Sequence, residues 1–399
     1  MVEERMGMTD LTLISLKDDF LEHEGDRPPL GILYIASFLE KYGYSIRILD
    51  LNHDEFTMDD SSVYGISFST PQYFIAHNLA KQIRKENKDV KIIAGGAHCS
   101  AWQKETGNPV SFNVFDQAVI GDGEIPMLNI MRGVTYRRYY SRRKYNLDIY
   151  PIPARHLVKM NRYPVGTLMS SRGCFGSCIF CSCPNIPYGF HSPERTVTEM
   201  EMLVNYGYKE LYFHDDTFTI EKNRVLDICD LVKEREISVK SRVNARVDTV
   251  DEEVVTQMVD AGFETLSFGF EHANNDVLKK SGKGNQKVED YEKVIEMCHN
   301  CGAKVYGYFI LNLPGATEET ARHTIQWAKD MRIERPSFYP LVAYPGTAVW
   351  SFGDKMGLQV RKHYGCFQAG RDLPSLNVEN PEFPNDRVLN LLEELKCKI

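Results

Sequence analysis

Three closely spaced cysteines are the residues of this sequence best suited to metal chemistry. Cys174, Cys178 and Cys181 form a C-x3-C-x2-C pattern after a short apolar segment, so we expect them on a loop that follows a strand. Soft thiolate ligands favour zinc or an iron–sulfur cluster. A structural zinc ion and a four-iron cluster each usually take four protein ligands, so three cysteines leave one metal position open. An open position can bind a substrate, which indicates a catalytic site.

Four other cysteines are interpreted without a catalytic or metal-binding role. Cys183 is an alternative fourth ligand, but it lies two residues after Cys181 and precedes a proline, and we interpret it as a neighbour. A zinc knuckle or a chance group of core thiols is the other alternative for this loop. Cys298 and Cys301 are expected to be core thiols. Cys366 is expected to be a surface or core thiol, and the alternative is a hydrogen-atom donor over the active site.

Composition limits the class of protein. The chain has 399 residues, of which 43% are hydrophobic and 26% charged, and its net charge is −8. An acidic balance argues against a general nucleic-acid binder. We find no apolar run long enough to span a bilayer and no signal peptide, so we predict a cytoplasmic enzyme without a membrane partner. The basic, aromatic segment 133–145 is interpreted as a solvated hairpin and linker rather than a nucleic-acid contact.

In the first third of the chain, the candidate ligand-binding residues are expected at one edge of a parallel sheet. Strand patterns alternate with helical patterns there, which is typical of a doubly wound, Rossmann-like domain. The expected strands are 11–16, 45–50, 62–68, 90–94 and 116–120, and the expected helices are 30–43, 71–86 and 122–132. Ligands bind at the carboxyl ends of such strands. Small and polar residues gather at those ends, namely Ser67, Thr70, Gly95, Gly96, His98, Gly121 and Glu124.

The second part repeats strand and helix six times. The expected strands are 166–171, 210–214, 239–244, 265–270, 304–311 and 336–342, and the helices between them are 195–207, 221–235, 251–261, 287–301 and 317–331. A full barrel of this kind has eight units, so six predict an open, partial (β/α)6 TIM-like barrel. The predicted organisation is a first domain at 1–135, a linker at 136–164, the barrel at 165–350 and a short C-terminal segment at 351–399, with a helix at 388–396.

The cysteine pattern, preceded by Ser170-Ser171-Arg172-Gly173, resembles the signature of the radical S-adenosylmethionine (SAM) superfamily. That resemblance implies a [4Fe–4S] cluster on the three cysteines, with the fourth iron chelating SAM. It also implies that an electron from the cluster cleaves SAM to a 5′-deoxyadenosyl radical, which abstracts a hydrogen atom from a substrate. The cofactor would supply this chemistry and the protein would supply position and exclusion of water.

The resemblance continues at the ends of the later strands. By it, Phe180 would lie against the adenine, Asp215 and Asp216 would meet the SAM amino group, and Glu271 would reach the ribose. Asn244 and Arg246 would meet the carboxylate or ribose. Segments 309–315 and 344–347 resemble the adenine segment and the motif after the sixth strand. Each match is weak alone, since a paired Asp can be a helix cap and Pro-Gly an ordinary turn, but their order supports the resemblance.

The first domain resembles the cobalamin-binding domains that are fused to radical SAM enzymes. The resemblance rests on Pro28-Pro29-Leu30-Gly31-Ile32-Leu33-Tyr34 and on the strand ends given above. It implies that cobalamin is contacted by Leu30, Gly31, Ser67, Thr70, Gly95, Gly96, His98, Gly121 and Glu124. The D-x-H-x-x-G motif, whose His ligates cobalt, is absent, because Asp50-Leu51-Asn52-His53 has the wrong spacing. His53 and His98 are candidates for a lower ligand, and structural hydrogen bonding is the alternative for both.

The resemblance implies a cobalamin-dependent radical SAM enzyme that transfers a methyl group to an unactivated carbon of a small-molecule or peptide substrate. Reduced flavodoxin or ferredoxin would be its electron donor. The same pair of domains also carries out ring contraction, cyclisation or oxidation, which is the first alternative. A non-catalytic cobalamin or cluster sensor is the second, and the expected SAM-binding carboxylates argue against it.

Overall fold

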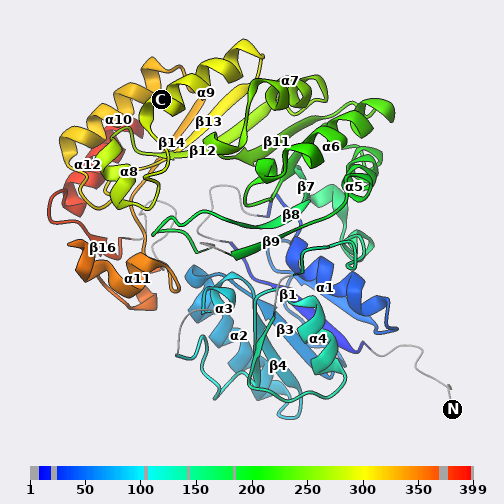
Figure 1. The fold of residues 1–399 in the computed structure, drawn as a ribbon. Coiled ribbons are helices and arrows are strands. Elements are labelled where there is room, and N and C mark those ends of the chain that lie inside the picture. Colours follow the sequence, from blue (N-terminus) through cyan, green and yellow to red (C-terminus); the bar gives the residue numbers. More distant parts are fainter. Residues whose placement is uncertain are drawn as a thin grey trace. The chain divides into compact units, whose positions relative to one another are not determined.

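The computed structural model describes residues 9–18, 25–102, 107–141, 144–182, 186–367 and 376–396. The chain divides into two compact units, each with its own sheet (Figure 1). The described residues of Met1–Lys144 and Ile149–Pro164 form most of the first unit. Those of Tyr145–Asp148, Val165–Cys366 and Leu373–Ile399 form the second.

A six-stranded parallel sheet forms the first unit, in the order β2-β1-β3-β4-β5-β6. The strands are β1 (Leu11–Ser15), β2 (Ile46–Asp50), β3 (Val63–Ser67), β4 (Lys91–Gly95), β5 (Gln117–Ile120) and β6 (Arg138–Tyr140). The helices between them are α1 (Leu30–Glu40), α2 (Tyr73–Glu86), α3 (Ala97–Ala101) and α4 (Glu124–Met131). From β1 the chain adds β2 on one side and then β3 to β6 on the other, so the strand order switches between β1 and β3. The predicted Rossmann-like, doubly wound fold is therefore confirmed.

Burial explains why these segments form strands and helices. The central strands read as nearly continuous apolar runs, as strands covered on both faces do, and β1 and β3 are each buried at four of five positions. Helix α1 buries eight of its eleven residues. Gly43 follows it with a φ of +83°, a left-handed conformation that glycine adopts at little cost.

The segment expected to be a hairpin and linker instead extends the first sheet. β6 pairs in parallel with β5, and Ala118 lies opposite Arg138. Arg138 and Tyr140 are exposed on this edge strand. The basic, aromatic composition of the segment is that of a strand at a sheet edge, where charged side chains are favoured over apolar ones.

The second unit contains another six-stranded parallel sheet, and its order follows the chain. The strands are β7 (Gly166–Leu168), β10 (Glu210–Phe213), β11 (Lys240–Ala245), β12 (Thr265–Glu271), β13 (Lys304–Ile310) and β14 (Arg335–Tyr339). The helices are α5 (Pro193–Asn205), α6 (Lys222–Glu234), α7 (Glu252–Asp260), α8 (Asn275–Lys280), α9 (Val288–Asn300) and α10 (Glu318–Asp330). β7 and β14 stand at opposite ends of this sheet. The predicted partial (β/α)6 barrel is confirmed.

The two faces of this second sheet differ in character. One face is apolar and covered by helices, because Phe309 of β13 contacts Trp327 of α10 at a ring-centroid distance of 6.2 Å and Phe270 of β12 contacts Tyr291 of α9 at 5.1 Å. Side chains alternate along a strand. Tyr306 and Tyr308 therefore point to the opposite, inner face, where they are only partly buried.

A separate two-stranded hairpin carries the cysteines. β8 (Ser171–Cys174) pairs antiparallel with β9 (Ile186–Phe190), and the cysteine loop joins them. The sequence predicts one strand at 166–171, whereas the structure ends β7 at Leu168 and begins β8 at Ser171. The break follows from Asp215, which accepts hydrogen bonds from Ser170 and Ser171 and turns the chain away from the sheet.

The C-terminal segment packs within the second unit. It contains α11 (Ala348–Phe352), β15 (Gln359–Val360), β16 (Val378–Glu379) and α12 (Asn385–Lys396). Phe383, Val388 and Leu391 form one apolar cluster with Leu311, Ala321 and Ile325. The helix predicted at 388–396 thus begins three residues earlier and closes the core beside α10. No helix in the described residues is both long and apolar enough to cross a membrane.

Candidate functional site

The cysteine loop begins at the end of β8 and is partly open to solvent. Cys174 is the last residue of β8, and Cys178 follows in the loop, where it is almost completely buried. Cys181 is half-buried, and its N–H donates to the Cys178 carbonyl at 3.3 Å. Phe180, the expected adenine contact, is also half-buried. Cys183 lies outside the described residues.

The turn after α8 holds the loop in place. The Ile179 N–H donates to the Ser281 carbonyl at 3.1 Å, and the Ser177 hydroxyl donates to the Gly282 carbonyl at 3.3 Å. Gly282 has a φ of +82°, and a Cβ there would lie 2.6 Å from the Ser177 carbonyl oxygen. The Val349 N–H of α11 donates to the Ile179 carbonyl. Two segments distant in sequence therefore fix the backbone between the cysteines.

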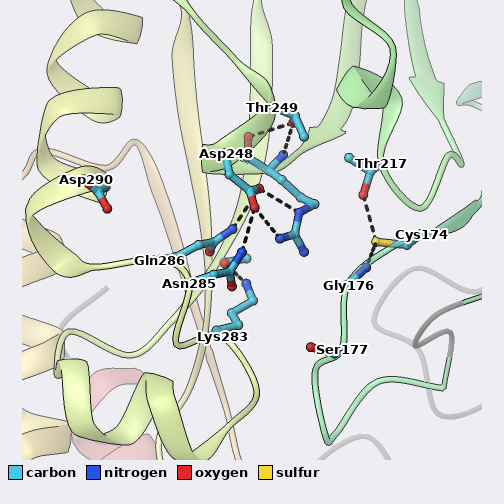
Figure 2. A network of polar contacts seen from close by, with 12 residues as sticks. Cys174, Gly176, Ser177, Thr217, Asp248, Thr249, Lys283, Asn285, Gln286 and Asp290 are labelled. Atoms are coloured by element: carbon cyan, nitrogen blue, oxygen red, sulfur yellow. Dashed lines mark hydrogen bonds and ion pairs between the residues drawn. The ribbon is translucent and has the colours of Figure 1, made fainter.

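A charged network lies beside the loop (Figure 2). Arg246 donates two hydrogen bonds to Asp248, at 2.8 and 2.7 Å, and its guanidinium lies 4.6 Å from the centre of the Phe175 ring. Asp248 also accepts from Gln286 at 3.0 Å and from Asn285 at 3.1 Å. Burial lowers the pKa of Arg246, but the bond to Asp248 and the nearby cysteines raise it overall. The side chain is a fixed cation next to the loop.

The Cys174 sulfur accepts a backbone hydrogen bond, as a metal-bound thiolate would. The Gly176 N–H points at Cys174 Sγ at 3.4 Å, and the Thr217 hydroxyl lies 3.5 Å from the same sulfur. A Cβ on Gly176 would lie 2.7 Å from Arg246 Nη1, so a larger residue would displace the guanidinium from its place beside the sulfur. Burial raises the pKa of the Cys178 thiol. The described residues contain no group of three or more His, Cys, Asp or Glu that could hold a single metal ion.

The two adjacent aspartates have different places. Asp215 is fully buried, and its oxygens accept from the Ser170 N–H and from the Ser170 and Ser171 hydroxyls at 2.6–2.7 Å. The sequence assigns it to the SAM amino group, but the structure gives it a positioning role beneath β8. Asp216 is exposed, and one of its oxygens accepts from the Gly173 N–H at 2.7 Å. Asp216 can therefore still meet a ligand.

The remaining expected SAM residues lie at the strand ends. Asn244 is partly exposed, and its amide donates to the Asp215 carbonyl at 3.0 Å. Glu271 has a φ of +65°, an unusual conformation for a non-glycine residue and one that clusters at functional sites. It forms an ion pair of 3.1 Å with Lys283, and a Cβ on Gly269 would clash with it at 2.4 Å.

The strand ends of the first unit form an open edge lined by glycine. Gly96 and Gly121 have φ values of +93° and +92°, which suit glycine alone. A Cβ on Gly96 would lie 2.6 Å from the Phe68 nitrogen, so the loops after β3 and β4 touch there. A Cβ on Gly31 or Gly95 would meet nothing within 4 Å. Ser67 is half-buried at the same edge.

Four other expected cobalamin contacts are buried. His98 is completely buried, and its ring nitrogens lie 3.1 Å from the Thr70 hydroxyl and 2.9 Å from the Pro109 carbonyl. Burial lowers its pKa to about 4, so the ring is neutral, and both of its nitrogens already contact groups of the surrounding loops, which it supports. Thr70, Leu30 and Glu124 are also buried. His53 bonds the Gly25 carbonyl at 2.8 Å.

Several residues of the site were not found from the sequence. Three of them lie in loops between elements, where the local sequence does not distinguish a site residue from an ordinary loop residue: Asp248, Gly282 and Lys283. Gln72 donates to the Leu16 and Lys17 carbonyls and joins the loops after β1 and β3. Two buried asparagines of the C-terminal segment act likewise in the second unit. Asn380 donates to the Leu313 and Ala316 carbonyls, and Asn377 bonds both the N–H and the carbonyl of Ala343.

Each of the two units is similar to a known protein family. The Radical SAM superfamily model matches residues 168–328, and the B12 binding domain model matches residues 17–130. An uncharacterised methyltransferase of Pyrococcus horikoshii is 30% identical over 82% of this chain and 78% of its own length. The hopanoid C-2 methylase of Rhodopseudomonas palustris is 24% identical, and the match covers 81% of this chain and 63% of that protein.

Solved structures share the fold. The radical SAM methyltransferase TsrM from Kitasatospora setae, with cobalamin and a [4Fe–4S] cluster bound, superposes with a TM-score of 0.73 over 89% of this chain and 81% of that chain, at 17% identity. A Rossmann-like B12 unit joined to a partial barrel with a three-cysteine loop defines a class of enzymes that combine an iron–sulfur cluster with cobalamin. The chain belongs to the radical SAM superfamily, in the branch that carries a B12-binding domain. Its cofactors are a [4Fe–4S] cluster, SAM and cobalamin.

Proposed function

We propose that this enzyme transfers a methyl group from SAM to an unactivated carbon of its substrate. The observation that carries the proposal is the presence, in one chain, of a three-cysteine loop and a cobalamin-type domain. The names of two relatives support it, because the P. horikoshii protein is named a methyltransferase and the R. palustris protein a C-2 methylase. A small-molecule or peptide substrate, reduced flavodoxin or ferredoxin as electron donor, and a cytoplasmic location remain predictions.

The cysteine loop fits a cluster with one open iron. In this proposal Cys174, Cys178 and Cys181 are the ligands, and the Gly176 N–H stabilises negative charge on the Cys174 sulfur. Arg246 adds a fixed positive charge on the same side. A thiolate is stabilised by such neighbours, which offsets the burial that raises the pKa of the Cys178 thiol.

The strand ends of the second unit fit SAM. We assign the ammonium group to Asp216, because its carboxylate is exposed while Asp215 is enclosed. We assign the ribose to Glu271, which the Lys283 ion pair holds in place, and the carboxylate end to Asn244. Phe180 would lie against the adenine. Arg246 is already paired with Asp248, so we assign it to the cluster loop rather than to SAM.

The glycine-lined edge of the first unit fits a large, flat ligand. Gly31 and Gly95 leave open space there, and Gly96 and Gly121 let the backbone approach closely. We infer that this edge binds cobalamin through the backbone and Ser67, and that His98 supports the loop from behind. When bound, the cluster with SAM supplies a carbon-centred radical and cobalamin supplies a methyl group. The residues given above bind and orient these groups.

A second candidate function is radical rearrangement or cyclisation without methyl transfer. It is favoured by one relative, the anaerobic magnesium-protoporphyrin IX monomethyl ester cyclase of Rubrivivax gelatinosus, which is 23% identical over 84% of this chain and 68% of its own length. The two functions share the SAM-cleaving half of the reaction. They differ in whether SAM also donates its methyl group.

Product analysis separates these functions without a known substrate. The full-length enzyme, reconstituted anaerobically with iron, sulfide and hydroxocobalamin, is incubated with SAM and dithionite. 5′-Deoxyadenosine and S-adenosylhomocysteine are then quantified by mass spectrometry. Methyl transfer predicts both products, with S-adenosylhomocysteine dependent on added cobalamin. 5′-Deoxyadenosine alone would support the second candidate.

Two variants serve as controls for this assay. Cys174→Ala should abolish 5′-deoxyadenosine, because it removes a cluster ligand, whereas Cys366→Ala should leave it unchanged. If the wild type forms neither product although it holds iron and cobalt, both functions are wrong and a sensor role takes their place.

A further inference from the structure

An arginine in the middle of the second sheet has contacts that the proposed roles of the cysteine loop do not account for. Arg242 lies on β11, and its guanidinium lies between two aromatic rings, 5.0 Å from the centre of the Tyr212 ring and 4.8 Å from that of Tyr306. Its Nε donates to the Ser267 hydroxyl at 2.9 Å, and its Nη2 donates to the Tyr308 hydroxyl. The side chain is thus fixed from four sides.

All of these partners are electrically neutral. Within the part of the chain that the structure describes, Arg242 forms no ion pair with a carboxylate, although the protein has a net charge of −8. Two other arginines of this unit are paired, Arg246 with Asp248 and Arg195 with Glu199. Arg224 donates only to neutral groups as well, but two of its three acceptors are backbone carbonyls, whereas Arg242 faces side-chain hydroxyls and rings. Partly buried charges usually have an opposite charge nearby. The guanidinium of Arg242 is prepared for an anion that the protein does not itself provide.

The neighbouring residues extend the same chemistry across the inner face. Tyr306 lies opposite Ser267 on one side and Arg335 on the other in the strand register. The Arg335 guanidinium lies 5.9 Å from the centre of the Tyr306 ring, and Arg335 likewise has no carboxylate partner among the described residues. Tyr212, Tyr306 and Tyr308 are only partly buried. This inner face therefore offers two cations, several hydroxyl donors and aromatic surface.

The site is close to the expected SAM contacts. Asn244 is two residues beyond Arg242 on the same strand, so both side chains point to the inner face, with a rise of roughly 7 Å between their backbones. Asn244 belongs to the row of residues at the carboxyl end of the strands. A ligand that bound an anionic group at Arg242 could therefore place another part of itself beside SAM.

We propose that the Arg242 site, comprising Arg242, Tyr212, Ser267, Tyr306, Tyr308 and Arg335, binds a carboxylate or phosphate group of the substrate. The substrate is then an anionic molecule with an aromatic or apolar part beside its charge, since tyrosine rings flank the cation. Arginine suits such groups because its planar donors match two oxygens at once. This inference rests on the proposed function, in that the anchored molecule is the one whose carbon reacts.

Binding of small probes tests the site directly. Benzoate and phenyl phosphate are titrated against the full-length holoenzyme at constant ionic strength, by saturation-transfer NMR, with neutral benzamide as the matched probe. At least one anion should bind saturably and benzamide should not. Arg242→Gln should weaken binding by at least about tenfold, the usual loss when a charged hydrogen-bonded pair is broken. The stronger of the two anions identifies a carboxylate or a phosphate as the natural group.

Control variants separate this site from a structural role. Arg242→Lys keeps the charge and should retain part of the affinity, whereas Arg235→Gln, at an exposed arginine, should retain all of it. SAM affinity and 5′-deoxyadenosine release are measured on the same samples, so a failure of the proposed function is seen separately from a failure of anion binding. If neither anion binds the wild type, or if Arg242→Gln binds as well as the wild type, the inference is overturned.

Discussion

At the scale of single residues, Arg246 is a cation whose position beside the cysteine loop affects how easily the cluster is reduced. Its guanidinium lies over the Phe175 ring and against Gly176, and Asp248 holds it by two hydrogen bonds. A cation beside an iron–sulfur cluster stabilises the reduced, more negative form. Arg246 therefore makes the cluster easier to reduce in our proposal, and this effect is separate from SAM binding.

Arg246→Gln tests that role. The variant removes the charge but keeps an amide that can bond Asp248. We expect the cluster's reduction potential to fall by roughly 60 mV, a tenfold change for a one-electron couple. An anaerobic redox titration followed by electron paramagnetic resonance measures it, with Arg235→Gln as the control. An unchanged potential together with weakened SAM binding would instead make Arg246 a SAM contact.

The sequence locates the reactive residues better than it assigns their roles. The spacing of Cys174, Cys178 and Cys181 and the strand-end position of Asp216 are readable without a structure, because both depend on local order. The enclosure of Asp215 and His98 is not readable. It depends on which way a side chain points and on partners 28 to 45 residues away, such as Thr70 for His98 and Ser170 for Asp215.

At the scale of elements, the turn after α8 supports the cysteine loop. Gly282 is left-handed, and its Cα approaches the backbone of Ser177 and Cys178 so closely that a Cβ would lie 2.6 Å from a carbonyl oxygen. Backbone cannot move aside as the end of a flexible side chain can. The loop and the turn must therefore shift together if anything larger than glycine is present.

Gly282→Ala should impair cluster assembly. We expect a lower iron content after reconstitution and a loss of stability beyond the roughly 1–2 kcal/mol of a left-handed alanine. Gly357→Ala is the matched control, because Gly357 has a φ of +77° but nothing within 4 Å of its Cβ position. Iron analysis and urea unfolding of both variants check this. Equal iron and equal stability in the two would mean that the contact with the loop is unimportant.

Most elements are predictable because their burial follows a simple period. Apart from β6, the strands of both sheets and the long helices lie within a few residues of their predicted positions. β6, α8 and the β8–β9 hairpin are not predicted, because each is short and depends on partners elsewhere in the chain. The cysteine-bearing strand β8 is separated from β7 by the pull of Asp215, a tertiary contact that no periodicity contains.

At the scale of the whole molecule, the chain consists of two units with their own cores and their own buried histidines. His98 belongs to the first unit, and His191 and His272 belong to the second. Burial lowers the pKa of each of these three histidines to about 4. They are neutral in the folded protein, whereas an unfolded chain would protonate them below its ordinary histidine pKa of about 6.5.

This difference predicts a loss of stability in weak acid. Because the unfolded state binds more protons than the folded state between about pH 6.5 and pH 4, the free energy of unfolding falls as the pH falls through that window. Each histidine contributes about 2 kcal/mol of this loss between pH 7 and pH 5. His98→Gln should therefore reduce the pH 7 to pH 5 difference for the first unit and leave the second unit unchanged.

Urea unfolding of the full-length holoenzyme at both pH values measures this, with cobalamin absorbance reporting the first unit and cluster absorbance the second. His156→Gln is the control, because the side chain of His156 is 64% exposed and contacts only the surface carboxylate of Glu40. A pH difference in the first unit that His98→Gln does not alter would mean that folding leaves the pKa of His98 unchanged. In that case water would reach the ring, so the contacts with Thr70 and Pro109 would not enclose it, and His98 could extend to the cobalamin edge.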